Sequence, residues 1–222
     1  DYNNYFTMNG FYKEPKNTVE TVFLGASVPS SFISSTELYK EYGLCAFSLA
    51  NPEQPVMASY YLLKDTYKRH SDTLKNVFFD VSELRGDTRD ETVHKALDYM
   101  PLSLTKIKAV YEYCEGDFTR MFNYLFPLSE FHNRWADLEW KDFDYFGKDP
   151  INGTRGYTFF LDSYRYKEAS MDATLVRYSL LYEEAIPVEL VDEAVVYFER
   201  MVQFCEENDL NLILFKCPAN NW

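Results

Sequence analysis

The segment that decides the fold is Thr21-Val22-Phe23-Leu24-Gly25-Ala26-Ser27, a short apolar run that ends in a glycine, a small residue and a serine. An apolar run of this length bounded by glycine is typical of a buried strand. The next helix signal begins at Ser34, so we expect strand, loop and helix, with Ser27 in the loop. In open α/β sheets, ligands bind at the carboxyl ends of the strands. Ser27 therefore stands where a nucleophilic serine would be placed, although on spacing alone a small polar turn residue is the simpler explanation.

Apolar runs and helical patterns alternate on both sides of the central region of the chain. Strands that alternate with helices predict right-handed crossovers and a parallel sheet. The sequence therefore indicates an α/β fold in which several loops meet at one edge of the sheet. We expect strands at 21–24, 44–49, 77–81 and 210–215, and helices at 34–43, 55–70 and 187–208.

Three of the expected helices carry an apolar stripe at helical spacing, which predicts the face that each one buries. In the helix at 55–70 the stripe is Val56, Tyr60, Leu63 and Tyr67. In a helix expected at 102–113 it is Leu104, Ile107 and Tyr111. In the long helix at 187–208 it is Val188, Val191, Val195, Phe198, Val202 and Cys205.

The helix that follows the first strand carries its own start and stop signals. Ser34-Ser35-Thr36-Glu37 has the form of a capping box, in which Ser34 and Glu37 each satisfy a free backbone N–H. Gly43 suits the carboxyl-terminal cap of that helix.

Strand–helix alternation is interrupted over about a hundred residues, which is too long for a loop inside a compact domain. We expect residues 1–20, polar and aromatic without a period, to be an amino-terminal arm. Residues 21–83 and 185–222 are expected to form the α/β core, and residues 84–184 a mostly helical, aromatic-rich insertion or cap. Within it, Asn152-Gly153-Thr154 matches a glycosylation sequon, and an Asn-Gly turn explains it as well.

Composition and charge narrow the classes of partner. A net charge of −13 argues against nucleic acid and against electrostatic attraction to anionic membranes. No stretch approaches the roughly 20 apolar residues of a membrane span. Aromatic residues make up 18% of the chain, so stacking on sugar rings is conceivable, but filling of the core is the simpler explanation.

The cysteines do not form a metal-binding pattern. None of the four lies in a CxxC pair, so we expect no zinc site. Free buried thiols are the simplest interpretation, and disulfides stay open because no pairing can be deduced. The four cysteines are Cys45, Cys114, Cys205 and Cys217.

Several segments resemble SGNH/GDSL-type hydrolases, and most of all the bacterial extracellular subgroup related to polysaccharide O-acetyltransferases and acetyl esterases. The resemblance touches most of the chain. The segments that carry it are Phe23-Leu24-Gly25-Ala26-Ser27, Glu41-Tyr42-Gly43, Leu49 through Pro55, Ser59-Tyr60-Tyr61-Leu62-Leu63-Lys64, Pro101-Leu102-Ser103, Phe126-Pro127 through His132-Asn133-Arg134-Trp135, and Arg155-Gly156-Tyr157.

This resemblance implies a flavodoxin-like, three-layer α/β/α domain that transfers acyl groups through a serine. It implies an acylated carbohydrate or another small ester as substrate, an extracellular or cell-surface location, and no metal or organic cofactor. Ser27 would be the nucleophile, the backbone N–H of Ala50 would help to form the oxyanion hole, and Asn51 would contribute an amide donor.

The chain departs from the family pattern at four places, one of which is Ala50, where the family has a glycine. Ala26 stands where the family has an acidic or hydroxyl residue, and Val28 stands where this subgroup often has a histidine. The third block normally supplies an asparagine, but this chain has Asp80, whose carboxylate would repel an oxyanion.

A serine nucleophile needs a base, and the chain offers three histidines. We expect His70 and His94 to be solvated side chains near the surface. His132, beside Arg134 and Trp135, belongs either to a structural polar cluster or to a substrate-contacting site that includes the base.

The catalytic Asp and His of the family lie in a block after the fourth strand. The sequence ends at Trp222, before such a block, so we expect a carboxyl-terminal strand and helix to be missing.

Two functions of different class follow. The first is a serine esterase or O-acyltransferase acting on acylated carbohydrate, and on that interpretation we expect this chain to be inactive by itself. The second is a catalytically degenerate relative that serves as a cell-surface binding or scaffold module.

Overall fold

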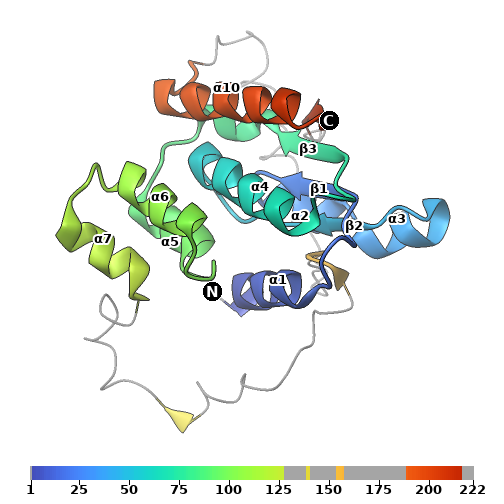
Figure 1. The fold of residues 1–222 in the computed structure, drawn as a ribbon, viewed down its shortest axis with the longest axis horizontal. Helices are drawn as coiled ribbons and strands as arrows, with labels where there is room; N and C mark the ends of the chain where they lie inside the picture. Colours follow the sequence, from blue (N-terminus) through green and yellow to red (C-terminus); the bar gives the residue numbers. More distant parts are fainter. Residues whose placement is uncertain (1, 128–138, 141–153, 158–188, 217–222) are drawn as a thin grey trace, which may run out of the picture.

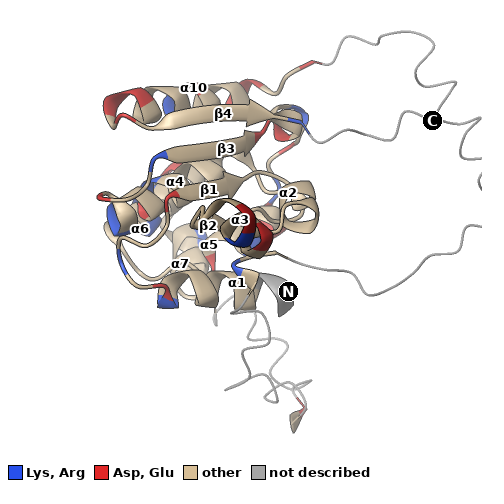
Figure 2. Cartoon of the chain, turned by 90° about the vertical axis from the view of Figure 1, so that its right-hand side faces the viewer, with Lys and Arg blue, Asp and Glu red and all other residues tan. Residues whose placement is uncertain are grey.

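Four short strands form one parallel sheet at the centre of the protein (Figure 1). The computed structural model describes residues 2–127, 139–140, 154–157 and 189–216. The strand order is β2-β1-β3-β4, and Figure 2 shows the arrows stacked in that order and pointing the same way. The predicted α/β fold with a parallel sheet is confirmed. The strands are β1 (Thr21–Leu24), β2 (Ala46–Ser48), β3 (Asn76–Asp80) and β4 (Asn211–Phe215).

Helices connect these strands in the order that parallel pairing requires. The segment with α2 and α3 leads from β1 to β2, α4 leads from β2 to β3, and α10 precedes β4. Right-handed crossovers put α4 and α10 on the face of the sheet opposite to α2 and α3. Contacts of α10 with α4 and of α3 with β2 agree with this arrangement. The helices are α2 (Ser27–Phe32), α3 (Ser35–Tyr42), α4 (Val56–His70) and α10 (Asp192–Glu207).

The core is built around α4, which is buried on almost every side. Of its predicted stripe, Val56, Tyr60 and Leu63 are buried and Tyr67 packs at the margin of the core. The intervening residues are buried too, because the sheet lies on one side of α4 and further helices cover the other. These residues include Met57, Ala58, Ser59, Tyr61 and Leu62.

The amino-terminal segment, which the sequence predicts to be an arm, contains a helix that packs into the core. The helix α1 (Tyr2–Lys13) buries Phe6, Met8 and Phe11 completely. The Phe11 ring contacts the ring of Phe47 in β2 at a centroid distance of 5.2 Å. Its buried apolar residues do not form a stripe at i, i+3, i+4 spacing, because Thr7 and Gly10 complete the buried face, and periodicity therefore missed the helix.

The central region contributes three helices and a short 3₁₀ turn to the same core. These elements are η1 (Val81–Arg85), α5 (Asp90–Leu97), α6 (Leu104–Tyr113) and α7 (Phe118–Leu125). Val93, Leu97 and Val110 belong to the hydrophobic cluster that also contains α4. The helical character expected of this region is thus present in its described part, while a boundary between core and cap stays a prediction.

The helix α6 turns the opposite face to the core from the one that the sequence predicts. Leu104 is 81% exposed and Tyr111 54% exposed, whereas Ala109 and Val110 are fully buried. Lys106 is also buried, and its ammonium donates to the carbonyl oxygens of Asp98 and Met100 at 3.2 Å each. Because the Lys106 ammonium has these hydrogen bonds, the face of α6 that carries Lys106 can be buried. A pattern of apolar and polar residues predicts such a face to be exposed.

The Ser34 half of the predicted capping box and the Gly43 cap of α3 are present, whereas the Glu37 carboxylate pairs with Lys40. Ser34 Oγ accepts a hydrogen bond from the Glu37 N–H at 3.3 Å, although the Glu37 carboxylate lies 3.4 Å from the Lys40 ammonium. Gly43 has a left-handed φ of +67° and donates its N–H to the Tyr39 carbonyl at 2.8 Å.

The described cysteines are free thiols: Cys45 is half-buried, and Cys114 and Cys205 are buried. Cys217 and the sequon at Asn152 lie outside the described residues. Within the described part of the chain, no helix combines the length and the apolar character needed to cross a bilayer.

Candidate functional site

The loops after β1, β2 and β3 meet at the carboxyl edge of the sheet, as the sequence predicts. The Asn51 N–H donates to the Gly25 carbonyl at 3.1 Å, which joins the first two loops. A Cβ atom added to Gly25 would lie 2.7 Å from Asp80 Cβ, so the first and third loops are also in contact. An ion pair of 2.5 Å between Glu53 and Arg89 links the second loop to the segment after β3.

At this point the order of the strands changes direction, because the chain moves from β1 to one side of the sheet and then continues on the other side. The chain passes from β1 to β2 on one side, and β3 pairs with the opposite side of β1. Ligands bind in such crevices in open α/β sheets.

Ser27 is the first residue of α2 and not a loop residue, which corrects the prediction. Pro29 in the first turn favours the helix because its φ is already close to the helical value. The Ser30 and Ser31 hydroxyls donate to the Ser27 carbonyl at 2.7 and 3.0 Å. The Ser27 side chain is half-buried, and no hydrogen bond joins its Oγ to another described residue. The backbone thus places Ser27 at the edge of the sheet, and its hydroxyl oxygen has no hydrogen-bond partner in the part of the chain that the structure describes.

Asn51 is held by a buried chain of side-chain hydrogen bonds that begins the connection to α4. Its Nδ2 donates to Gln54 Oε1 at 2.9 Å, and Gln54 Nε2 donates to Ser59 Oγ at 2.9 Å. All three residues are buried. Because its backbone N–H is bonded to Gly25, Asn51 can offer only the second hydrogen of its amide to a ligand.

Ala50 lies between Leu49 and Asn51, whose backbone N–H groups both point toward β1. The N–H groups of Leu49 and Asn51 donate to the carbonyls of Phe23 and Gly25, whereas the Ser48 N–H donates to Arg155 on the outer side of β2. Successive amides of an extended strand point to opposite sides, so this ladder places the Ala50 N–H with that of Ser48. The oxyanion role of Ala50 stays a prediction, and these bonds do not support it.

Asp80 lies at the end of β3 and caps η1. It is fully buried, and its Oδ1 accepts hydrogen bonds from the backbone N–H of Ser82, at 3.0 Å, and from the Ser82 hydroxyl. Its Oδ2 is buried and has no partner among the described residues. The capping bonds explain an aspartate at this position, because a carboxylate oxygen suits the N-cap of a helical turn.

A pocket of about 460 Å³ opens beside this meeting point. Burial first, and then the neighbouring carboxylates of Asp80 and Glu53, raise the pKa of Glu83 above its usual value, and the positive charge of Arg85 offsets part of this rise. Among the described residues, no group of three His, Cys, Asp or Glu side chains could hold a metal ion. The residues that line the pocket are Glu53, Ser82, Glu83, Arg85, Gly86, Asp87 and Arg89.

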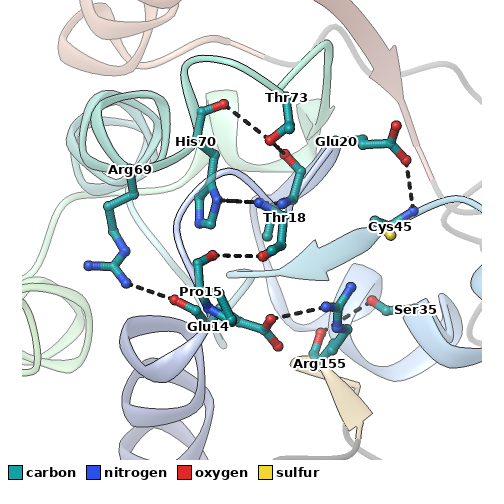
Figure 3. Close-up of polar contacts among 11 residues, drawn as sticks. Glu14, Pro15, Thr18, Glu20, Ser35, Cys45, Arg69, His70, Thr73 and Arg155 are labelled. Carbon is teal, nitrogen blue, oxygen red and sulfur yellow. Dashed lines mark hydrogen bonds and ion pairs between the residues drawn. The ribbon is translucent and has the colours of Figure 1, made fainter.

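His70 is buried at the other end of the sheet, so its predicted surface position is wrong. As the last residue of α4, it lies where the chain turns back toward the start of β3. Its Nδ1 accepts hydrogen bonds from the N–H groups of Thr18 and Val19, at 3.2 and 3.4 Å (Figure 3). Burial first, and then the charges of Arg69 and Arg155, lower the pKa of His70 to about 4.

His94 is also largely buried and is engaged by two neighbours. It stacks on the Tyr124 ring at a centroid distance of 3.9 Å, and its Nδ1 lies 2.9 Å from the Asp98 carboxylate. Its solvated position is thus a second incorrect prediction. Neither of these histidines contacts Ser27 in the described structure. His132, Arg134 and Trp135 lie outside the described residues.

The aromatic residues serve the core more than the pocket. Phe6, Phe11, Phe47, Phe79 and Tyr61 are fully buried, and no aromatic residue lines the pocket among the described residues.

Sequence reasoning did not single out the charged pocket residues after β3. The interrupted strand–helix alternation after 83 drew attention to a cap, whereas Gly86 between charged residues was the available sign of a turn at the sheet edge.

Comparison with protein-family models, with curated proteins and with solved structures found no match to this chain. The resemblance to SGNH/GDSL-type hydrolases therefore stays an expectation from the residues quoted above.

Proposed function

We propose that this chain belongs to a serine esterase or O-acyltransferase that acts on acylated carbohydrate, with Ser27 as the nucleophile. The observation that carries the proposal is the placement of Ser27 at the carboxyl edge of β1, where three loops meet beside a pocket. Its hydroxyl has no structural hydrogen bond to a described residue, which is compatible with a role toward a ligand.

Acyl transfer from this position takes two steps. The Ser27 oxygen attacks the ester carbonyl and transfers its proton to a base, and the alcohol leaves as the acyl-serine bond forms. Water or a sugar hydroxyl then attacks the acyl-serine and releases Ser27. The second hydrogen of the Asn51 amide is a donor available to the developing oxyanion, because the first is bonded to Gln54.

The base is the component that the described residues do not supply. His70 and His94 are committed to structural contacts elsewhere in the fold. The family resemblance assigns this role to a histidine of a carboxyl-terminal block, and His132 is the other candidate within the chain.

A non-catalytic binding module is the second candidate, and one observation favours it. Asp80, which is buried and lies next to Gly25 through its Cβ and backbone, brings a carboxyl group to the end of β3, where the resemblance would require an asparagine. A negative charge at that place disfavours an oxyanion. A pocket without this chemistry still binds a ligand.

Hydrolysis of p-nitrophenyl acetate by the protein as its gene encodes it separates the two candidates. For the esterase we expect Ser27→Ala to lower kcat/KM to the background rate, a loss of at least about 100-fold. Ser71→Ala, an exposed hydroxyl removed at the far end of α4, should leave the rate unchanged, and circular dichroism should show both variants folded. Full activity of Ser27→Ala would disprove the role of Ser27, and no activity in the unmodified protein would favour the binding module.

A further inference from the structure

The apolar stripe of α6 that the sequence predicts to be buried lies on the surface of the protein. Leu104, Ile107 and Tyr111 are exposed, because α6 packs against the core through its other face. The neighbouring helix α7 adds Phe118 and Phe122, which lie one turn apart and are 80% and 52% exposed. The pair of helices is therefore apolar on its outer side as well as on the side that faces the core.

The exposed residues of the two helices lie on the same side of the pair. Tyr113 of α6 and Tyr124 of α7 both donate to the Asp90 carboxylate of α5, at 2.7 and 2.8 Å. Each tyrosine follows an exposed residue by about half a helical turn, so both exposed stripes face away from α5. The Tyr111 ring lies against Gly116 in the turn between the helices, which joins the two stripes. Figure 1 shows α6 and α7 at one margin of the molecule, away from the sheet.

This apolar side, which we name the α6–α7 surface, consists of Leu104, Ile107, Tyr111, Phe118 and Phe122. From their exposed fractions, and with about 200 Å² for a large side chain, it presents roughly 600 Å² of apolar area. A standard interface buries about 800 Å² on each partner, of which about 65% is apolar in homodimers. The α6–α7 surface therefore has the apolar area that the core of a stable dimer interface needs.

We propose that a second copy of this chain covers the α6–α7 surface in a twofold-symmetric dimer. This proposal is independent of the proposed acyl transfer, because none of the five residues belongs to the site at Ser27.

The distribution of charge favours a second copy as the occupant. The chain has a net charge of −13, so two copies repel each other when they approach in most orientations. Residues 101–127, which contain both helices, hold three basic and three acidic side chains and thus carry no net charge. Two copies can meet through this region without the repulsion that the rest of the chain imposes.

Two exposed charges beside the surface are placed to pair across a twofold axis. Lys108 lies in α6 next to the apolar stripe, Glu115 lies in the turn after α6, and Tyr111 lies about midway between them. A twofold axis near Tyr111 pairs α6 antiparallel with α6 of the second copy. This arrangement lays the two stripes on each other and puts Lys108 of each copy opposite Glu115 of the other. Glu115 has no ion pair within the described part of the chain, and the Lys108 ammonium lies 3.8 Å from Glu112.

Sedimentation velocity of the protein between about 1 and 200 µM tests the proposal. We expect a monomer–dimer equilibrium with a Kd of about 1–50 µM, in the range of interfaces of modest size. Phe118→Glu should raise this Kd at least about 20-fold, because it places a charge in an apolar interface. Phe32→Glu is the matched control, since Phe32 in α2 is 78% exposed and lies outside the α6–α7 surface. It should leave the Kd unchanged, and circular dichroism should show both variants folded.

A charge exchange separates a second copy from any other occupant. Lys108→Glu and Glu115→Lys should each raise the Kd about tenfold, because twofold symmetry repeats each repulsion. The double variant should return the Kd to within about twofold of the original value, since the opposite charges face each other again.

Three results would overturn the proposal. The first is a protein that stays monomeric at about 200 µM, which would assign the surface to a different protein or to a lipid surface. The second is a dimer that Phe118→Glu and Phe32→Glu weaken equally. The third is a double charge variant that is weakened as much as the two single variants combined.

Discussion

Gly25 is the residue on which the candidate site depends most directly. Its φ of +121° lies outside the range that side-chain-bearing residues adopt, and Asp80 Cβ occupies the space that a side chain would need. The glycine thus lets β1 approach the end of β3 closely while its carbonyl accepts the Asn51 N–H. The apolar run ending in Gly25 predicted the strand, but only the structure shows what the glycine contacts.

Replacement of Gly25 by alanine should destabilise the protein strongly, because backbone strain and a steric clash with Asp80 act together. We expect a loss of about 2–4 kcal/mol in the free energy of unfolding, measured by urea denaturation. Gly43→Ala is the matched control: φ there is also positive, at +67°, but nothing lies within 4 Å of the added Cβ. It should cost only about 1 kcal/mol. Equal losses in the two variants would contradict the close approach of Gly25 to Asp80.

Individual site residues were harder to foresee than the site itself. The meeting of the loops at one edge of the sheet followed from the strand pattern, since each loop after a parallel strand must reach that edge. The position of Ser27 at the start of a helix did not. The burial of His70 did not, because its Nδ1 is satisfied by the backbone of Thr18 and Val19, far away in the sequence. A long-range partner of this kind leaves no local signal.

At the scale of elements, residues 155 and 156 attach to the outer edge of β2. The Arg155 carbonyl accepts hydrogen bonds from the Ser48 N–H at 3.0 Å and from the Ser35 hydroxyl at 3.2 Å. The Arg155 guanidinium forms an ion pair with Glu14 at 3.0 Å (Figure 3). This attachment covers an edge strand that would otherwise leave backbone groups unpaired.

Gly156→Ala should detach this segment from β2, since a Cβ atom there would lie 1.9 Å from the Ser48 carbonyl oxygen. We expect the Ser48 amide to exchange with deuterium at least about tenfold faster, measured by hydrogen exchange and NMR. Gly116→Ala is the control, with a positive φ of +77° but only the Tyr111 ring nearby. Unchanged exchange at Ser48 in Gly156→Ala would refute the attachment.

The elements themselves were predicted unevenly. All four strands were found within two residues of their expected ends, because short apolar runs bounded by glycine, proline or charge are strong local signals. The helix α5 was not foreseen, and α6 buries a face containing Lys106. Both depend on tertiary contacts that periodicity does not describe.

At the scale of the whole molecule, hydrogen bonds from the end of α4 hold the end of α1 and the segment that follows it. Arg69 donates to the carbonyls of Tyr12 and Glu14, and His70 accepts from Thr18 and Val19. Figure 3 shows the bond from Arg69 to Glu14 close to the bond from Thr18 to His70. The Nδ1 atom of His70 can accept these bonds only when the imidazole is neutral. The hydrogen bonds that hold the segment after α1 against the core therefore depend on pH.

Stability should therefore fall as the solution is acidified. The folded-state pKa of His70, about 4, lies below the ordinary value of 6.5, so the unfolded chain takes up the proton first. This contribution is complete above pH 6.5 and is lost progressively down to about pH 4. We expect a loss of roughly 2–3 kcal/mol from this group, measured by urea denaturation across that range. His70→Gln keeps an acceptor and does not titrate, so its stability should change less; a decline equal to that of the unmodified protein would contradict the assignment.

The most direct test of the central claim is labelling of the protein, as its gene encodes it, with a fluorophosphonate probe, read by intact mass and peptide mapping. Because such probes react with activated serines, we expect one label, located on Ser27, and none in Ser27→Ala. Absence of labelling in folded protein, or a label on a different serine, would contradict the account that Ser27 is the nucleophile of an acyl-transfer site.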